Sequence, residues 1–119
     1  MDASFTILGD PASKANSRRI VFSAGRVRSI KSKKALDYSQ VFIAQCPKLH
    51  TLLTGDLRVT ITIHYATRRS DLDESLILDL MQGMIYENDR AVKEKHIFGR
   101  LDRKNPRAEI LVEEIEAAI

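Results

Sequence analysis

Alternating apolar and polar residues mark one strand clearly, in the segment Leu57–Tyr65. The apolar residues of this segment are Val59, Ile61, Ile63 and Tyr65, and the polar ones are Arg58, Thr60, Thr62 and His64. Successive side chains of a β-strand point to opposite faces of a sheet. The segment therefore predicts a strand with one buried face and one exposed face.

Weaker patterns of the same kind predict five further strands. They are Ser4–Leu8, Ile20–Ser23, Arg26–Ile30, Ala91–Phe98 and Ala108–Val112. Gly9–Pro11 ends the first of them. Ala24-Gly25 separates the second from the third, which predicts a hairpin. Between the last two lies a turn with Asp102, Asn105 and Pro106, which are residue types that favour turns.

Apolar residues at helical spacing predict a first helix between the hairpin and the main strand. Ser32 is expected to cap this helix, which runs to about Gln45 before Pro47 stops it. The residues expected to face inward are Leu36, Val41, Phe42 and Ala44. Their spacing follows the period of an amphipathic helix.

A second predicted helix follows the strand Leu57–Tyr65. Asp73 is expected to be its N-cap residue, and Leu72 is expected to pack onto Ile77 as a hydrophobic staple. The apolar residues at helical spacing are Leu76, Ile77, Leu80, Met81 and Met84. The helix is expected to end near Gly83–Tyr86. This order of elements predicts an α+β domain with a mixed sheet and about two helices.

Length and composition indicate one globular domain over residues 1–119. Hydrophobic residues make up 44% of the 119 residues, which is too many for a disordered chain. No apolar run approaches the roughly 20 residues of a membrane span. The first ten residues, MDASFTILGD, lack the features of a signal peptide. Cys46 is the single cysteine, which fits a reducing compartment. We therefore expect a cytoplasmic protein without membrane association.

The positive charges are clustered, although the net charge is only +3. The first cluster contains no acidic residue and consists of Lys14, Arg18, Arg19, Arg26, Arg28, Lys31, Lys33 and Lys34. Such clustering is typical of proteins that bind polyanions. A second basic group, interrupted by Glu94 and Asp102, contains Arg90, Lys93, Lys95, Arg100, Arg103, Lys104 and Arg107. For this group, a solvated surface and a phosphate contact are equally good interpretations.

Residues 68–74 read RRSDLDE and place three carboxylates directly after two arginines. Asp71, Asp73 and Glu74 repel one another unless a cation lies between them. Oxygen ligands at a strand-to-helix junction suit Mg²⁺, which also binds substrate phosphate. Arg68 and Arg69 could clamp phosphate oxygens. The alternative is a helix cap with a favourable helix-dipole interaction.

The segment from Arg68 to Val92 resembles the signature of the RusA family of Holliday-junction resolvases, found in phages, prophages and bacteria. The matching stretches are SDLDE, LDLMQG and IYENDRAV. The early GDPASKANSRR resembles the family's opening loop, and the late PRAEILV resembles its last strand. The resemblance covers nearly the whole chain, and its central 25 residues or so are specific only as a set.

The resemblance implies a homodimeric, Mg²⁺-dependent endonuclease that cuts four-way DNA junctions symmetrically, with Mn²⁺ as a possible substitute metal. The family's three catalytic acids, which hold the metal, fall on Asp71, Asp73 and Asp89, and Glu74 is an additional candidate ligand. Asp79 matches a family position inside the second helix, where a structural role is implied. The residues expected to contact DNA are Lys14, Arg18, Arg19, Arg26, Arg28, Lys31, Lys33, Lys34, Arg68, Arg69 and Arg90. No Gly-rich phosphate loop is present, so no nucleotide cofactor is expected.

Two departures from the family pattern leave alternatives open. Glu74 stands where the family has Asn, and the family's catalytic Lys in the helix has no counterpart between Asp73 and Asp89. A basic residue elsewhere could replace it, the candidates being Arg68, Arg69, Arg90 and Lys93. Otherwise the protein binds DNA junctions with weak or lost nuclease activity. A protein of the same fold that binds no nucleic acid is a third alternative.

The position of Asp89 raises a question of geometry. A helix of about a dozen residues spans ~18 Å and would separate Asp73 from Asp89. Either the chain folds back after the helix, or the Asp89 of a two-fold partner completes the site. The sequence supports the second arrangement as a hypothesis.

Overall fold

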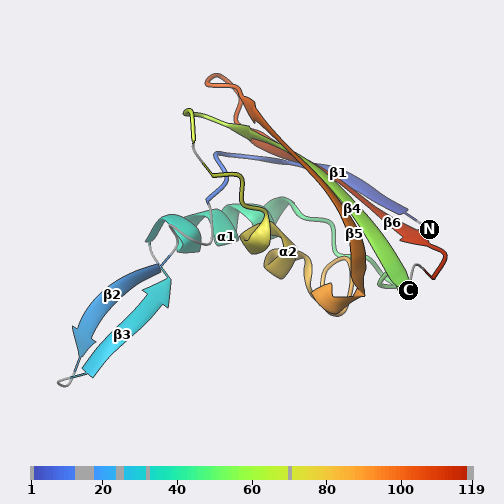
Figure 1. Ribbon diagram of the computed structural model, residues 1–119, viewed down its shortest axis with the longest axis horizontal. Coiled ribbons are helices and arrows are strands. Elements are labelled where there is room, and N and C mark those ends of the chain that lie inside the picture. Colours follow the sequence, from blue (N-terminus) through green and yellow to red (C-terminus); the bar gives the residue numbers. More distant parts are fainter. Residues whose placement is uncertain (1, 13–17, 24–25, 32, 70, 118–119) are drawn as a thin grey trace.

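β-branched residues form the centre of a four-stranded mixed sheet. Its strands are β1 (Asp2–Leu8), β4 (Asp56–Tyr65), β5 (Val92–Leu101) and β6 (Arg107–Ile115), in the order β1-β6-β4-β5. β4 pairs antiparallel with β6 and parallel with β5, and β1 pairs antiparallel with β6. The computed structural model describes residues 2–12, 18–23, 26–31, 33–69 and 71–117, with the backbone alone for 18–23 and 26–31. Figure 1 shows the strands and their order.

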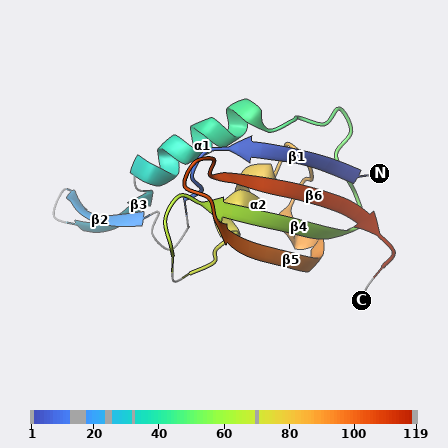
Figure 2. The same cartoon turned by 90° about the horizontal axis from the view of Figure 1, so that it is seen from above.

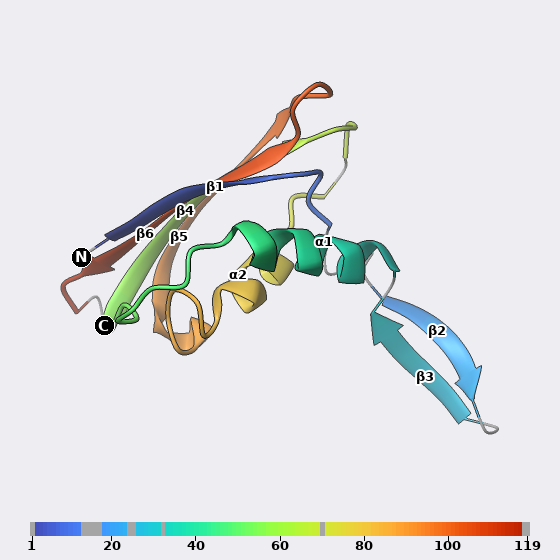
Figure 3. The same ribbon diagram turned by 180° about the vertical axis from the view of Figure 1, so that it is seen from behind.

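Two helices cover one face of this sheet. α1 (Lys33–Gln45) and α2 (Ser75–Met81) lie on the same side of the strands, as Figures 2 and 3 show. The predicted alternation of β4 is confirmed, because every second side chain from Leu57 to Tyr65 is buried. The α+β fold with a mixed sheet and two helices is therefore as predicted. Within the described residues, no helix is both long enough and apolar enough to cross a membrane.

The inward face of α1 differs from the prediction. Leu36, Val41 and Ala44 are exposed, whereas the buried residues are Ala35, Tyr38 and Phe42. Phe42 is buried as predicted. Ala35, Tyr38, Phe42 and Cys46 recur at helical spacing and form the buried stripe. The Gln45 side chain joins the end of α1 to β1, since its Oε1 accepts a hydrogen bond from the Leu8 N–H and its Nε2 donates one to the Leu8 carbonyl, both at 2.8 Å.

The start of α2 is shifted by one residue from the prediction. Glu74 is its N-cap residue, while the Asp73 Oδ1 accepts a hydrogen bond from the Ser75 N–H at 2.9 Å. Leu72, expected to pack onto Ile77, is 44% exposed and lies beside Gly99 of β5. The helix ends at Met81, two residues before Gly83, whose φ of 82° stops a helix.

The predicted basic hairpin is confirmed in its backbone. β2 (Arg18–Ser23) and β3 (Arg26–Lys31) pair antiparallel and form a sheet of their own. Figure 1 shows the hairpin extending away from the main sheet and the helices. The turn at Ala24-Gly25, the expected cap Ser32 and the basic residue Lys14 lie outside the described residues.

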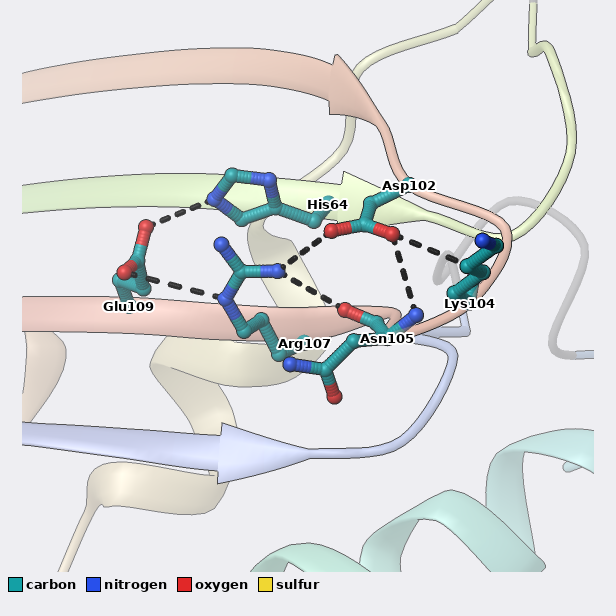
Figure 4. Close-up of polar contacts among 6 residues, drawn as sticks. All are labelled: His64, Asp102, Lys104, Asn105, Arg107 and Glu109. Carbon is teal, nitrogen blue, oxygen red and sulfur yellow. Dashed lines mark hydrogen bonds and ion pairs between the residues drawn. The ribbon is translucent and has the colours of Figure 1, made fainter.

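Turn chemistry joins β5 to β6 as the sequence predicts. The Asp102 Oδ1 accepts hydrogen bonds from the backbone N–H groups of Lys104 and Asn105, at 3.2 and 3.1 Å. Arg107 donates to the other carboxylate oxygen at 2.9 Å, and this hydrogen bond lowers the pKa of Asp102. Figure 4 shows this network continuing through Glu109 to His64. The network fastens the turn to the end of β4.

Candidate functional site

The predicted acidic segment lies where β4 ends and α2 begins. Tyr65, the last residue of β4, anchors it, because the Asp73 N–H donates a hydrogen bond to the Tyr65 hydroxyl at 3.4 Å. Burial raises the pKa of Tyr65, so its hydroxyl is neutral at physiological pH. Ser70 lies outside the described residues. The strand end thus holds the backbone of Asp73, one of the predicted metal ligands.

Arg69 is held inside the protein and orients Asp71. Its side chain is only 10% exposed, and its guanidinium lies 4.8 Å from the centre of the Tyr65 ring. Its Nε lies 3.8 Å from the Asp71 Oδ1, and its Nη1 donates to the Pro11 carbonyl at 3.3 Å. Asp71 itself is 40% exposed in its side chain. The guanidinium of Arg69 is therefore covered, while the Asp71 carboxylate beside it is open to solvent.

The loop after β1 is attached to the same segment. The Ala66 N–H donates a hydrogen bond to the Asp10 Oδ1 at 2.9 Å, and the Lys34 Nζ lies 4.0 Å from the Asp10 Oδ2. Together with the contact between Arg69 and Pro11, these bonds fix both ends of the basic hairpin beside the acidic segment. The backbone that leads into the hairpin and the backbone that carries Asp71 thus form one connected region.

A pocket of about 440 Å³ opens at the C-terminal ends of β4 and β5. Its polar lining comes from Tyr65, Thr67, Arg68, Arg69, Asp71 and Arg100. The exposed guanidinium groups of Arg68 and Arg100 line this pocket beside Asp71, and such groups suit phosphate oxygens. Sequence reasoning left Arg100 undecided, because only the parallel pairing of β4 and β5 brings it to this pocket. No local sequence signal could have shown this.

Glu74 and Lys95 form an ion pair beside the start of α2. The Lys95 Nζ lies 3.2 Å from the Glu74 Oε2. Lys95 was not among the basic residues considered as a replacement for the family's lysine, although β5 places it there. Glu74, an additional candidate ligand in the sequence, is thus already paired with a cation.

Asp89 lies away from Asp71 and the pocket. It begins the short 3₁₀ helix η1 (Asp89–Ala91), directly before β5, and its N–H donates to the Gln82 Oε1 at 3.3 Å. Asp71 shares its pocket with the opposite end of β5. A ten-residue strand spans about 30 Å. Among the described residues, no three His, Cys, Asp or Glu side chains come together as a metal-binding group.

The predicted DNA-contacting residues that the structure describes occupy four regions. Arg18, Arg19, Arg26, Arg28 and Lys31 lie on the backbone of the hairpin, while Lys33 and Lys34 are exposed in the first turn of α1. Arg68 is exposed at the pocket, and Arg90 is exposed in η1, near Asp89. The hairpin, the start of α1 and the pocket are connected through the loop after β1, whereas Arg90 lies apart.

Comparison with known proteins does not assign the chain to a family. No protein-family model matches the chain, and no curated protein matches it either. Membership of the RusA family therefore stays a prediction from the motifs in residues 68–92. The charged groups around the pocket are the structural support for a function.

Proposed function

We propose that this protein is a Mg²⁺-dependent endonuclease that cuts four-way DNA junctions as a homodimer. The observation that carries the proposal is the pocket at the ends of β4 and β5, which is lined by Arg68, Arg69 and Arg100 together with Asp71. Guanidinium groups beside a carboxylate can bind a phosphodiester next to a metal ligand. Resolution of junctions in DNA recombination or repair is the process that such chemistry would serve.

The donor atoms of the acidic segment fit Mg²⁺. Asp71 and Asp73 are two residues apart, Tyr65 holds the backbone of Asp73, and Mg²⁺ binds to one or two carboxylates while keeping several waters. Asp71 and Asp73 would hold the ion, whereas Asp89, the third expected ligand, lies at the other end of β5 in the same chain. Bound Mg²⁺ would stabilise negative charge on the phosphoryl oxygens and activate a water for attack.

The residues of this chain would bind and orient the substrate. Arg68 and Arg100 are exposed and would contact the phosphates on either side of the scissile bond. Arg69 would keep Asp71 in place. Lys95 would place a positive charge beside the start of α2, where the family has its lysine.

The basic hairpin would hold the arms of the junction. Its strands carry Arg18, Arg19, Arg26, Arg28 and Lys31 and extend away from the main sheet and the helices (Figure 1). Contacts to phosphates position a protein without reading base sequence. Recognition would then depend on the shape of the junction. The affinity would fall steeply with salt, because each neutralised phosphate releases counterions.

Cleavage of a labelled synthetic four-way junction tests the proposal. A linear duplex of the same sequence serves as the control substrate, and each reaction is run with Mg²⁺ and with EDTA. We expect nicks in the junction alone, at symmetric positions in opposite strands, and none in EDTA. A junction that is bound but uncut in both Mg²⁺ and Mn²⁺ would identify a junction-binding protein without nuclease activity. Equal, weak binding of junction and duplex would reject both functions.

A further inference from the structure

A hollow of about 460 Å³ lies where the basic hairpin joins α1. α1 lines it with Lys33, Lys34 and Tyr38, and the loop after β1 lines it with Gly9 and Asp10. α1 begins two residues after the end of β3, so the hollow lies at the foot of the hairpin (Figure 3). Its volume falls in the range of roughly 300–1,000 Å³ that is typical of small-ligand sites.

The side chain of Tyr38 is buried in the wall of this hollow, and its hydroxyl group is unpaired. Tyr38 is only 4% exposed, and its ring packs edge-on against Phe42, with 6.1 Å between the ring centres. Among the residues that the structure describes, this hydroxyl is the one buried side-chain polar group without a hydrogen-bond partner. A buried polar group without a partner costs stability. A ligand in the hollow would supply the missing partner.

The Tyr38 hydroxyl can donate a hydrogen bond at physiological pH. Burial raises the pKa of Tyr38, and the Asp10 carboxylate, which also lines the hollow, raises it further. The proton therefore stays on the oxygen and is available to an acceptor. A ligand with an exposed oxygen atom would remove the cost of leaving this donor unpaired.

The charges around the hollow favour an anion as the acceptor. The Asp10 carboxylate is already engaged, because its Oδ1 accepts a hydrogen bond from the Ala66 N–H and its Oδ2 lies 4.0 Å from the Lys34 Nζ. Asp37 is exposed at the rim, one helical turn after Lys33, a spacing at which opposite charges attract. The two lysines thus offset the two acids. The N-terminal end of α1, which begins at the hollow, adds a partial positive charge.

We propose that this hollow binds one phosphate of the DNA backbone, with the Tyr38 hydroxyl as hydrogen-bond donor and Lys33 and Lys34 as charged contacts. The phosphate would belong to the junction arm that lies along the basic hairpin, since β3 leads directly into α1. The hollow would then fix the point at which this arm meets the body of the protein. The inference rests on the DNA-binding part of the proposed function and is independent of cleavage.

The variant Tyr38→Phe tests the role of the hydroxyl. It removes an unpaired polar group from the free protein, so the midpoint of urea denaturation should stay the same or rise. It also removes a donor to phosphate, so the affinity for a labelled four-way junction should fall about tenfold. A lower midpoint, or an unchanged affinity, would overturn the proposal.

Tyr86→Phe is the matched control for this substitution. Tyr86 is equally buried, but its hydroxyl donates a hydrogen bond to the Leu78 carbonyl at 2.7 Å. Its loss leaves a buried carbonyl without this donor, so the denaturation midpoint should fall while the junction affinity stays that of the wild type. The two variants are thus expected to change stability and affinity in opposite ways.

The salt dependence of binding separates the hydroxyl contact from the lysine contacts. A neutral hydroxyl releases no counterion, so Tyr38→Phe should weaken junction binding by the same factor at about 50 and about 200 mM salt. Lys34→Ala should lower the slope of log affinity against log salt by about 0.9, because one charged phosphate contact is lost. A slope that changes in Tyr38→Phe, or that Lys34→Ala leaves unchanged, would contradict these contacts.

Inorganic phosphate tests the hollow without DNA. A ligand that binds only the folded state raises the denaturation midpoint. Phosphate also stabilises proteins generally through exclusion from their surface, and this effect is common to all variants. Sodium phosphate should therefore stabilise the wild type more than Tyr38→Phe, whereas sodium chloride at equal ionic strength should affect both alike. Equal stabilisation of both proteins by phosphate would overturn the site. Phosphate binding by a protein that binds no DNA would instead reject the proposed function and identify the hollow as a site for free phosphate.

Discussion

Two adjacent arginines illustrate how much the structure adds at the scale of single residues. Sequence reasoning expected both Arg68 and Arg69 to contact phosphate. Arg68 is exposed at the mouth of the pocket, whereas the side chain of Arg69 lies against Tyr65, Asp71 and the Pro11 carbonyl. The doublet RR cannot show this difference, because residues distant in sequence decide which arginine is covered.

Replacing Arg69 with Ala should therefore affect stability. The variant loses a ring contact, an ion pair and a hydrogen bond in a largely buried position, and we expect a loss of about 1–3 kcal/mol in the free energy of unfolding. Urea denaturation measures it. Arg68→Ala is the matched control and should change stability by less than about 0.5 kcal/mol, while weakening junction binding. Equal effects of both variants on stability would contradict the assigned roles.

Replacing Lys95 or Lys93 distinguishes two candidates for the role of the missing family lysine. Lys95 lies 3.2 Å from Glu74 at the start of α2, whereas Lys93 was one of the four candidates from the sequence. We expect Lys95→Ala to lower the single-turnover cleavage rate about tenfold or more at unchanged junction affinity. Lys93→Ala should retain the wild-type rate. The reverse result would restore the sequence-based candidate.

Cys46 predicts a pH dependence of stability. Burial raises the pKa of its thiol from near 9 to about 11. Since the folded state holds this proton more tightly than the unfolded state, the contribution to stability is fully present below pH 9 and is lost between pH 9 and 11. Urea titrations at several pH values should show this decline, and it should be smaller in Cys46→Ala, which leaves only the tyrosines and lysines to titrate. An identical decline in both proteins would contradict the burial of the thiol.

At the scale of helices and strands, the sequence predicted correctly the features that depend on neighbouring residues. The alternation in β4, the hairpin β2–β3 and the turn at Asp102 depend on neighbouring residues, and all three were predicted correctly. The inward face of α1 was predicted correctly only at Phe42, because the buried stripe runs through Ala35 and Tyr38 and leaves the larger Leu36 and Val41 exposed. The presence of Arg100 and Lys95 at the site could not be predicted, because it follows from the parallel pairing of β4 with β5.

The hairpin predicts a measurable salt dependence. Replacing Arg26 and Arg28 with Ala should reduce the slope of log affinity against log salt by about 1.8, since each phosphate contact contributes about 0.9. Fluorescence anisotropy of a labelled junction between 50 and 200 mM salt measures the slope. Lys48→Ala, which removes an exposed charge after α1, should leave the slope unchanged. A slope that the hairpin variant does not change would remove the hairpin from the DNA interface.

The whole molecule combines an acidic segment, an arginine-lined pocket and a basic hairpin in one connected region. The loop after β1 joins them through Asp10 and Pro11. The remaining predicted acid, Asp89, lies at the other end of β5. Symmetric cleavage would follow from the two-fold axis of the proposed homodimer.

The most direct test of this account is cleavage of a supercoiled plasmid that extrudes a cruciform. Paired cuts across the junction within one complex convert it to linear DNA, whereas single nicks give open circles. The account predicts linear product in Mg²⁺, none with Asp71→Asn, and wild-type yield with Asp37→Asn, which changes an exposed acid on α1. Open circles alone, or equal cleavage by Asp71→Asn and the wild type, would contradict it.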